Sequence, residues 1–190
     1  IWAFGKDGVM VKSSDNGSTW ELADSPTSSD LHYSDSAHGA LVVAAADGLV
    51  LIKQEIGGGW LDISIPVENM SGSQVNGIAL TSNQSVLAVG SGGSIWKYDN
   101  GIWRDIASGV DSDLMAVSFL DNTMGVAVGA SGTILFSEDK GTTWDYRDAP
   151  SEASDSTISS VIFFSDIRIY ATTNDGQVLI SSRDGGTDVG

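Results

Sequence analysis

One eight-residue pattern occurs twice in this chain and constrains its fold more than any other feature. The pattern is Ser-x-Asp-x-Gly-x-Thr-Trp, and its two copies occupy residues 13–20 and 137–144. Each copy follows a short apolar run, which is typical of a loop between two strands of a hairpin. The aspartate can accept hydrogen bonds from its own turn, and the glycine supplies a positive φ angle. The pattern therefore predicts two equivalent, self-capped hairpin loops.

The residues of these two loops have structural rather than chemical roles in this interpretation. Threonine starts the outgoing strand, and tryptophan offers a large flat surface for packing against a neighbouring unit. A calcium-binding role has less support, because the further oxygen ligands of such loops are missing. The predicted structural residues are Ser13, Asp15, Gly17, Thr19 and Trp20 in the first copy, and Ser137, Asp139, Gly141, Thr143 and Trp144 in the second.

Two markers recur along the whole chain and divide it into units. Trp20, Trp60, Trp103 and Trp144 follow one another at intervals of 40, 43 and 41 residues by subtraction. This period is typical of a propeller blade of four strands. The second marker is a tight-turn tetrad that ends in glycine, at residues 5–8, 45–48, 90–93, 129–132 and 173–176. The markers predict one domain or domain fragment with units at approximately 1–24, 25–66, 67–108, 109–150 and 151–190.

The expected fold is an all-β propeller of four-stranded antiparallel blades without helices. Unit four is the template, with strand-like runs at residues 114–119, 125–128, 133–136 and 143–146. Unit one lacks an inner strand, and unit five ends before an outer strand. Because propellers remove exposed strand edges by closing their ring, we expect the five units to belong to a larger ring of six to seven blades. The alternative is a closed five-bladed ring.

The charge balance narrows the classes of partner. The chain has 25 acidic and 9 basic residues, for a formal net charge of −16. Such a chain repels nucleic acids and anionic membrane surfaces, so we expect no nucleic-acid partner. It has no apolar run of 18 residues, so we expect no membrane insertion. Cysteine is absent, which excludes disulfides and thiolate metal sites.

The two loops resemble the Asp-box of the bacterial neuraminidase repeat. This repeat occurs in propellers of sialidases, of glucan-cleaving glycoside hydrolases, of sortilin-type receptors and of photosystem II stability and assembly factors. The run from Val126 to Leu135, which leads into the second Asp-box, is most similar to the assembly-factor family. That resemblance implies a non-enzymatic propeller that holds or assembles other proteins outside the cytoplasm. It implies no cofactor.

The connections between units are the candidate binding surface. They span residues 24–30, 66–74, 108–113 and 148–157, and they are rich in serine, glycine and aspartate. Loops of this kind should cluster on one face around the central channel. Asp30 and Asp113 each precede the first inner-strand residue, and Asp155 lies nearby. These three carboxylates could face a basic partner or a cation, or they could simply cap turns and solvate the surface.

No catalytic residue and no metal site is predicted. Sialidases bind the substrate carboxylate with clustered arginines, but Arg104 and Arg147 fall on predicted outer strands, away from the channel. Glycoside hydrolysis needs a pair of carboxylates across a cleft, and no pair is distinguished by its spacing. His32 and His38 form no recognisable metal or nucleophile motif.

Two classes of function follow from these observations. The first is a propeller scaffold whose partner is another protein, basic in character, or further blades of its own chain. The alternative is a carbohydrate-active propeller, either a sialidase- or glucanase-like hydrolase or a sugar-binding module, whose key residues lie outside this chain. Every tryptophan falls where it would pack between blades or within a strand, so none is free to stack on a sugar. This favours the scaffold.

Overall fold

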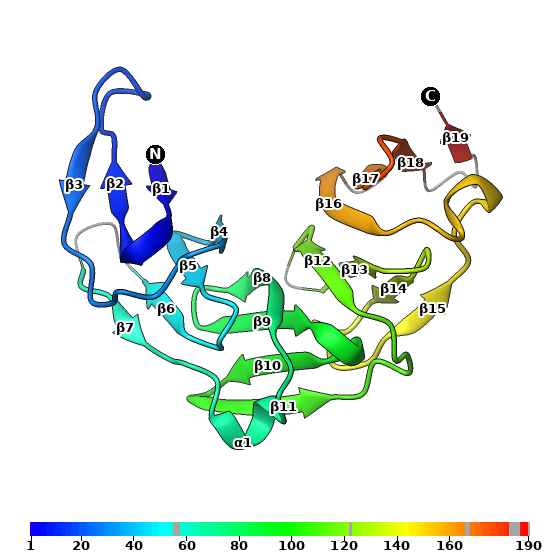
Figure 1. Cartoon of the computed structure of the whole chain (residues 1–190), viewed down its shortest axis with the longest axis horizontal. Coiled ribbons are helices and arrows are strands. Elements are labelled where there is room, and N and C mark those ends of the chain that lie inside the picture. Colours follow the sequence, from blue (N-terminus) through cyan, green and yellow to red (C-terminus); the bar gives the residue numbers. More distant parts are fainter. Residues whose placement is uncertain (55–57, 122, 166–167, 183–186, 190) are drawn as a thin grey trace.

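A computed structural model describes residues 1–54, 58–121, 123–165, 168–182 and 187–189. Its strands form five antiparallel sheets that follow one another along an arc (Figure 1). Strands β4, β8, β12 and β16 line the inside of the arc, and later strands of each sheet lie progressively farther out. The sequence prediction of an all-β propeller with five blade units is confirmed, in the form of a partial propeller.

Each blade adds its strands in chain order. Blade one contains β1 (Trp2–Phe4), β2 (Met10–Lys12) and β3 (Glu21–Ala23). Blade two contains β4 (Tyr33–Ala37), β5 (Ala40–Ala44), β6 (Val50–Lys53) and β7 (Leu61–Asp62). Blade three contains β8 (Val75–Ser82), β9 (Ser85–Gly90), β10 (Ile95–Asp99) and β11 (Ile102–Ile106). Blade four contains β12 (Leu114–Phe119), β13 (Gly125–Gly129), β14 (Ile134–Ser137) and β15 (Asp145–Arg147). Blade five contains β16 (Ile158–Ser165), β17 (Arg168–Thr173), β18 (Val178–Ser182) and β19 (Thr187–Val189).

In the described residues, one short α-helix and three single-turn 3₁₀ helices interrupt this pattern, so the prediction of a chain without helices is wrong. Helix α1 (Val67–Met70) is a single turn in the connection between blades two and three. It buries Met70, whose sulfur lies beneath the turn at Gly48. One turn is too short to produce the 3.6-residue periodicity by which a helix is recognised in a sequence. In the described part of the chain, no helix is long and apolar enough to cross a bilayer.

Blade one has an unpaired inner edge. Among the described residues its sheet has three strands and no inner strand, as the sequence predicted, and β1 pairs with β2. Ile1 and Ser13 exchange two backbone hydrogen bonds of 2.9 and 2.8 Å. Because antiparallel pairs alternate between hydrogen-bonded and non-hydrogen-bonded positions, the backbone N–H and C=O groups of Trp2 and Phe4 point away from β2. They form the free edge of the sheet.

Blade five has an outer strand, which contradicts the prediction that it ends before one. Strand β19 pairs with β18 through the partners Ser181 and Thr187, and Leu179 and Val189. A strand of three residues forms through backbone pairing, and its residue types need not mark it in the sequence. Residues 183–186, between β18 and β19, lie outside the described residues, as do residues 55–57 between β6 and β7.

The hydrophobic core is a series of layers between adjacent blades. Four clusters of buried side chains join blade one to two, two to three, three to four and four to five. The middle strands supply most of each layer, and every residue of β9 and β13 is buried. Such strands are covered on both faces, which explains their continuous apolar runs in place of an alternating pattern. Each blade is therefore stabilised by its immediate neighbours.

The tetrad glycines let the chain pass closely from one blade to the next. A Cβ atom on Gly8 would lie 2.0 Å from the carbonyl oxygen of Thr27, and one on Gly93 would lie 2.0 Å from that of Val110. Both glycines also have positive φ angles, of 71° and 70°. The sequence pattern predicts the turn, and the close approach of the following connection is a second and independent reason for glycine.

Candidate binding surfaces

The first Asp-box loop is closed by side-chain hydrogen bonds to its own backbone. Ser13 Oγ donates to Asp15 Oδ1 at 2.8 Å and accepts from the N–H of Gly17 at 2.8 Å. The Asp15 carboxylate accepts from the N–H of Thr19 at 2.9 Å and from its hydroxyl at 2.6 Å. Asn16 and Gly17 have φ angles of 59° and 89°, which the tight turn requires. These bonds use the polar groups of the loop internally.

The second Asp-box loop has the same bonds and also packs against another blade. Asp139 accepts from the N–H and hydroxyl of Thr143 at 2.8 and 2.7 Å, and the N–H of Gly141 donates to Ser137 Oγ at 2.9 Å. A Cβ atom on Gly141 would lie 2.3 Å from Leu87 Cδ1 in blade three. The second loop therefore contributes to the contact between blades three and four.

The hydrogen bonds lower the pKa values of both Asp-box carboxyl groups. The pKa of Asp15 is lowered from 3.8 to about 2 by the hydrogen bonds from the Thr19 hydroxyl and N–H, and to a smaller extent by the hydrogen bond from Ser13. Partial burial raises the pKa of Asp139, but the hydrogen bonds from Thr143, Ser137 and Thr142 outweigh it, so that the pKa is lowered overall. Both groups are carboxylates at neutral pH.

Replacing Thr19 with valine should raise the pKa of Asp15 toward 3.8, because the variant loses the hydroxyl donor. A depressed carboxyl pKa contributes stability that is present above the unfolded value and is lost as the pH falls through the folded value. For Asp15 this window runs from 3.8 down to about 2. Carbon-detected NMR titration of the Asp15 carboxyl group measures the shift. Thr19→Ser keeps the donor and should keep the low pKa; an unchanged titration in Thr19→Val would contradict this account.

Three tryptophans that lie in or directly before an outer strand pack toward the preceding blade. Trp60 meets the Trp2 ring edge-on, with ring centroids 5.8 Å apart and an interplanar angle of 82°. Trp103 Nε1 donates to the carbonyl of Ile63 in blade two. Trp144 lies in the layer between blades three and four. Trp20 differs, because it is 46% exposed and no described sheet lies on that side of blade one.

Two of the three predicted binding-face carboxylates form hydrogen bonds between blades. Asp30 Oδ1 accepts from the N–H of Asp7 at 2.8 Å, and Asp113 Oδ1 accepts from the N–H of Gly92 at 2.7 Å. Both donors belong to the tetrad of the preceding blade. Asp155 is exposed in the connection between blades four and five. The three residues lie at the same end of their sheets, where the inner strands begin.

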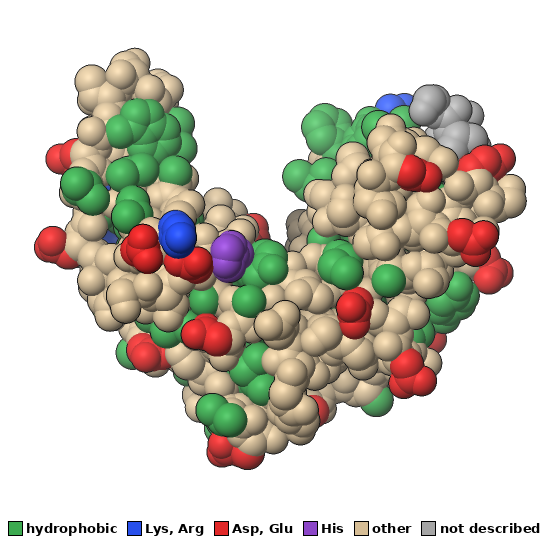
Figure 2. Space-filling model, in the orientation of Figure 1, with side chains coloured by type: hydrophobic (Ala, Val, Ile, Leu, Met, Phe, Trp, Pro, Cys, Tyr) green, Lys and Arg blue, Asp and Glu red, His purple; other side chains and the backbone are tan. Residues whose placement is uncertain are grey.

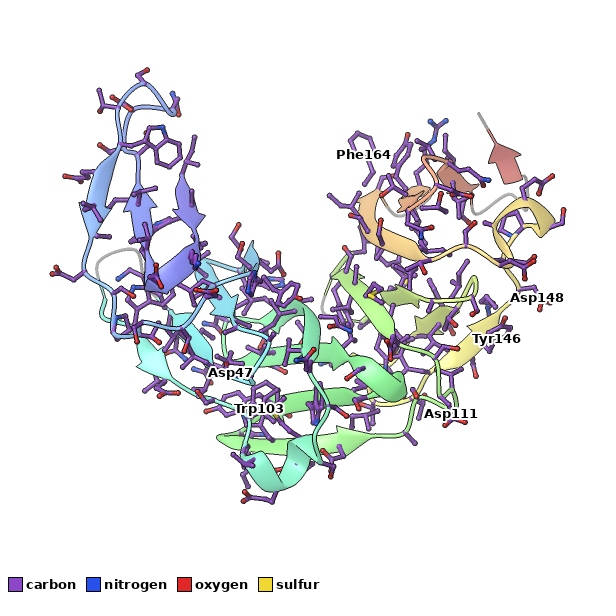
Figure 3. The ribbon with its side chains drawn as sticks, in the orientation of Figure 1. Asp47, Trp103, Asp111, Tyr146, Asp148 and Phe164 are labelled. Carbon is purple, nitrogen blue, oxygen red and sulfur yellow. The ribbon has the colours of Figure 1, made fainter. Side chains whose placement is uncertain are left out.

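That end of the sheets is strongly acidic, and we call it the connection face. It consists of the five tetrads and the connections at residues 24–30, 66–74, 108–113 and 148–157. Figure 3 shows three of its carboxylates, Asp47, Asp111 and Asp148, spaced around the arc. Lys6 is its one basic residue. Its acidic residues are Asp7, Asp24, Asp30, Asp47, Glu68, Asp111, Asp113, Asp148, Glu152, Asp155 and Asp175.

A hollow of about 500 Å³ lies between the inner strands. Its polar wall groups form contacts between blades: Asp35 Oδ2 accepts from the N–H of Leu80 at 2.8 Å, and Ser118 Oγ accepts from that of Phe163 at 3.2 Å. Arg104 and Arg147 lie on outer strands β11 and β15, as predicted. Among the described residues, no group of three or more histidine or acidic side chains could hold a metal ion.

A second hollow, of about 600 Å³, lies between blades one and two and was not predicted from the sequence. It borders the free edge of β1 at Trp2, and its lining includes Lys12, Lys53 and His38. Lys12 pairs with Glu21 at 3.1 Å, and Lys53 Nζ lies 5.8 Å from the centroid of the Trp60 ring. Lys12 is the last residue of β2 and Lys53 is the last residue of β6, and each of these strands lies next to the outermost strand of its blade. This equivalent position is the sequence signal that could have placed the two lysines together.

The fold and these surfaces define a partial Asp-box β-propeller with an acidic connection face. The family model described as "Photosynthesis system II assembly factor YCF48" matches residues 95–189, half of the chain. The chain therefore belongs to this assembly-factor family, and the resemblance inferred from the sequence motifs is confirmed. No curated protein matches the sequence.

Solved structures of the family have the same fold. A structure described as YCF48 bound to D1 peptide has a TM-score of 0.70 and 18% identity, and the alignment covers 100% of this chain and 61% of that one. YCF48 from Cyanidioschyzon merolae has a TM-score of 0.72 and 16% identity, with coverages of 100% and 68%. An ancestral GH74 enzyme has a TM-score of 0.72 and 12% identity, with coverages of 100% and 29%. At these identities the likeness shows the fold alone, and this chain spans about three fifths of the first relative.

Proposed function

We propose that this chain is part of a non-enzymatic propeller scaffold that binds another protein outside the cytoplasm. The observation that carries the proposal is the match to the assembly-factor family over residues 95–189. A structure from that family is described as bound to a D1 peptide, which supports a protein segment as the kind of partner. The extracytoplasmic setting rests on the family resemblance.

The connection face is the surface that we assign to the partner. It has eleven carboxylates and one lysine, so its electrostatic potential attracts positively charged segments and accelerates their association. Neither Asp30 nor Asp113 forms an ion pair with a described lysine or arginine. Their negative charges are therefore available to a basic partner, although one oxygen of each already accepts a backbone hydrogen bond.

We further propose that the five blades belong to a larger ring of six to seven blades. Figure 2 shows a deep notch between the arms formed by blades one and five, with hydrophobic side chains on both arms. Phe164 is 73% exposed and points into this notch (Figure 3). The free edge of β1 and the exposed ring of Trp20 lie on the other arm. A further strand would pair with the edge of β1, and additional blades would cover Phe164 and Trp20, in keeping with the greater length of the solved relatives.

The charge assignment is tested by fluorescence anisotropy with a labelled lysine-rich peptide and its glutamate-substituted counterpart. We expect the basic peptide to bind and its affinity to fall with added salt. The triple variant Asp30→Asn, Asp113→Asn, Asp155→Asn should weaken binding about tenfold, since each exposed charge contributes roughly 0.5 kcal/mol. Asparagine retains an oxygen that can accept the bonds from Asp7 and Gly92. The variant therefore changes charge while keeping the contacts between blades.

Asp145→Asn is the matched control, because Asp145 is exposed on β15 and lies outside the connection face. It should leave the affinity for the basic peptide nearly unchanged. Equal binding of both peptides, or equal weakening by the control and the triple variant, would contradict the proposal.

The carbohydrate-active alternative has narrower support. It rests on a fold shared with the ancestral GH74 enzyme at 12% identity, over 29% of that chain. Neither Arg104 nor Arg147 lies at the inner hollow. No described feature of this chain favours a sugar over a protein segment.

A further inference from the structure

A tryptophan has the same register position in blades one to four, and in blades two, three and four it packs toward the preceding blade. In blade three, Trp103 on β11 is opposite Tyr98 on β10. In blade four, Asp145 on β15 is opposite Phe136 on β14, so Trp144, one residue earlier, has the equivalent position beside Ser137. Trp60 has the corresponding place in blade two, one residue before Leu61, which pairs with Ile52. Trp103 and Trp144 are only 8% and 9% exposed. Each ring fills space between its own blade and the preceding one.

Blade five has a threonine at this position. Its outer strand pairs Ile180 with Asp188 and Ser181 with Thr187. Comparison with the Phe136–Asp145 pair of blade four shows that Thr187 is the backbone equivalent of Trp144. Residues 181–190 contain no aromatic residue at all. In the strand register, Thr187 therefore stands where blades two, three and four have a tryptophan.

A hollow of about 330 Å³ lies between blades four and five. Val126 and Val128 of β13 line it on the side of blade four. Their equivalents in blade three are Leu87 and Val89 of β9, which belong to the buried layer that contains Trp144. The wall on this side is therefore the counterpart of the wall against which Trp144 packs.

The residues of the opposite wall, in blade five, also have equivalents in the buried layer that contains Trp144. Ala171 of β17 and Leu179 of β18 line the hollow on the side of blade five. Their equivalents in blade four are Ala127 and Leu135, which share the buried layer of Trp144. Two residues on each wall of the hollow are thus equivalents of residues in the buried layer that contains the Trp144 ring.

The rim of the hollow is polar and lies toward the outer side of the arc. Arg147 from the end of β15 and Asp148 from the following connection line it together with Pro150. Figure 3 shows Asp148 at the outer border of the arc, between blades four and five. An apolar interior with a few polar groups at its mouth is the usual composition of a ligand pocket.

We propose that this hollow is a binding site for the indole ring of a tryptophan in a bound polypeptide segment. The occupant follows from the three equivalent positions in blades two, three and four, each of which is a tryptophan. Apolar cavities of this kind remain dry and accept apolar rings. Burial of one ring alone gives weak affinity, with a dissociation constant on the order of 1 mM for a single amino-acid derivative. The flanking residues of a real partner would add contacts at the rim.

The probe for this site is N-acetyl-L-tryptophanamide, titrated into the unmodified protein and followed by methyl NMR. We expect saturable shifts of the Val126, Val128 and Leu179 methyl groups, and no saturable shift with N-acetyl-L-alaninamide. Absence of saturable shifts at these methyl groups would overturn the proposal. Concentration-dependent dimerisation that protects the same methyl groups without the probe would also overturn it, because the occupant would then be a second copy of the chain.

A substitution at Thr187, the backbone equivalent of Trp144, tests the site with a side chain of the protein itself. Thr187→Trp supplies the missing ring, so it should raise Tm by about 3 °C or more and abolish probe binding. Thr187→Ser is the matched control and should change neither property appreciably. An unchanged Tm together with retained probe binding in Thr187→Trp would contradict the assignment.

A second pair of variants keeps the test decisive if Thr187→Trp does not fold. Ala171→Leu adds volume to the hollow and should weaken probe binding at least fivefold without lowering Tm, whereas Ala127→Leu adds it to the niche filled by Trp144 and should lower Tm. The proposal would be overturned if Ala171→Leu and Ala127→Leu lowered Tm equally and Ala171→Leu still bound the probe fully. The basic peptide and the connection face are not involved, so failure here and failure of the charge-based function are distinguishable.

Discussion

Gly93→Ala should lower the free energy of unfolding by more than about 3 kcal/mol, a large part of the stability of an ordinary domain. The added Cβ would lie 2.0 Å from the carbonyl oxygen of Val110 and 3.0 Å from Ser108 Oγ. The φ angle of 70° adds a conformational penalty of about 1–2 kcal/mol for any residue with a Cβ. Both groups that the Cβ meets belong to the connection into blade four. Urea unfolding followed by tryptophan fluorescence measures the loss.

Gly92→Ala and Gly176→Ala separate the two components of this effect. Gly92 has a φ angle of 63° and Gly176 one of 92°, yet a Cβ on either would meet no described atom within 4 Å. Each variant should therefore show only the conformational penalty of about 1–2 kcal/mol. If Gly93→Ala is no worse than these two, the close approach of the connection is not what requires glycine at residue 93.

Trp144→Ala should lower the free energy of unfolding by about 3–5 kcal/mol, because it leaves a cavity in the layer between blades three and four. The ring is 9% exposed and meets Phe119 edge-on, with ring centroids 6.2 Å apart and an interplanar angle of 79°. Its Nε1 is buried without a hydrogen-bond partner in the described structure. Trp144→Phe should therefore lose much less, since it keeps most of the packing and removes an unsatisfied donor. Urea unfolding of both variants measures the difference.

Trp20→Ala is the matched control, because Trp20 has the same place in its Asp-box but is 46% exposed. In this chain it should lose only about 1 kcal/mol, in proportion to the smaller area removed from water. In a longer polypeptide of the proposed larger ring, a further blade packed on Trp20 should make the loss comparable to that of Trp144→Ala. A small loss in both settings would contradict a larger ring that covers this side of blade one.

Most of the fold could be predicted from the sequence because its signals are local. The bonds within residues 13–19 join groups no more than four positions apart, so the residue types of the Asp-box predict its turn directly. The spacing of the tryptophans and tetrads predicts the number of blades for the same reason. Strand β19 was missed because its short backbone pairing has no side-chain signature.

The candidate surfaces depend on contacts between blades, which the sequence does not reveal. Asp30 and Asp113 bond to turns 23 and 21 residues away, so in the sequence they resemble free surface carboxylates. Their part in a binding face stays a prediction. The substitution of Thr187 for a tryptophan also gains meaning only when the strand register and the hollow are seen together.

The layered core has a consequence for how the chain unfolds. Each of the four buried clusters joins two adjacent blades, so blade three is held by two interfaces and blades one and five by one each. Cooperativity in such a linear array passes from neighbour to neighbour, and fraying begins at the ends. Any molecule that covers an end blade therefore protects the middle blades as well, by making the first step of unfolding less favourable.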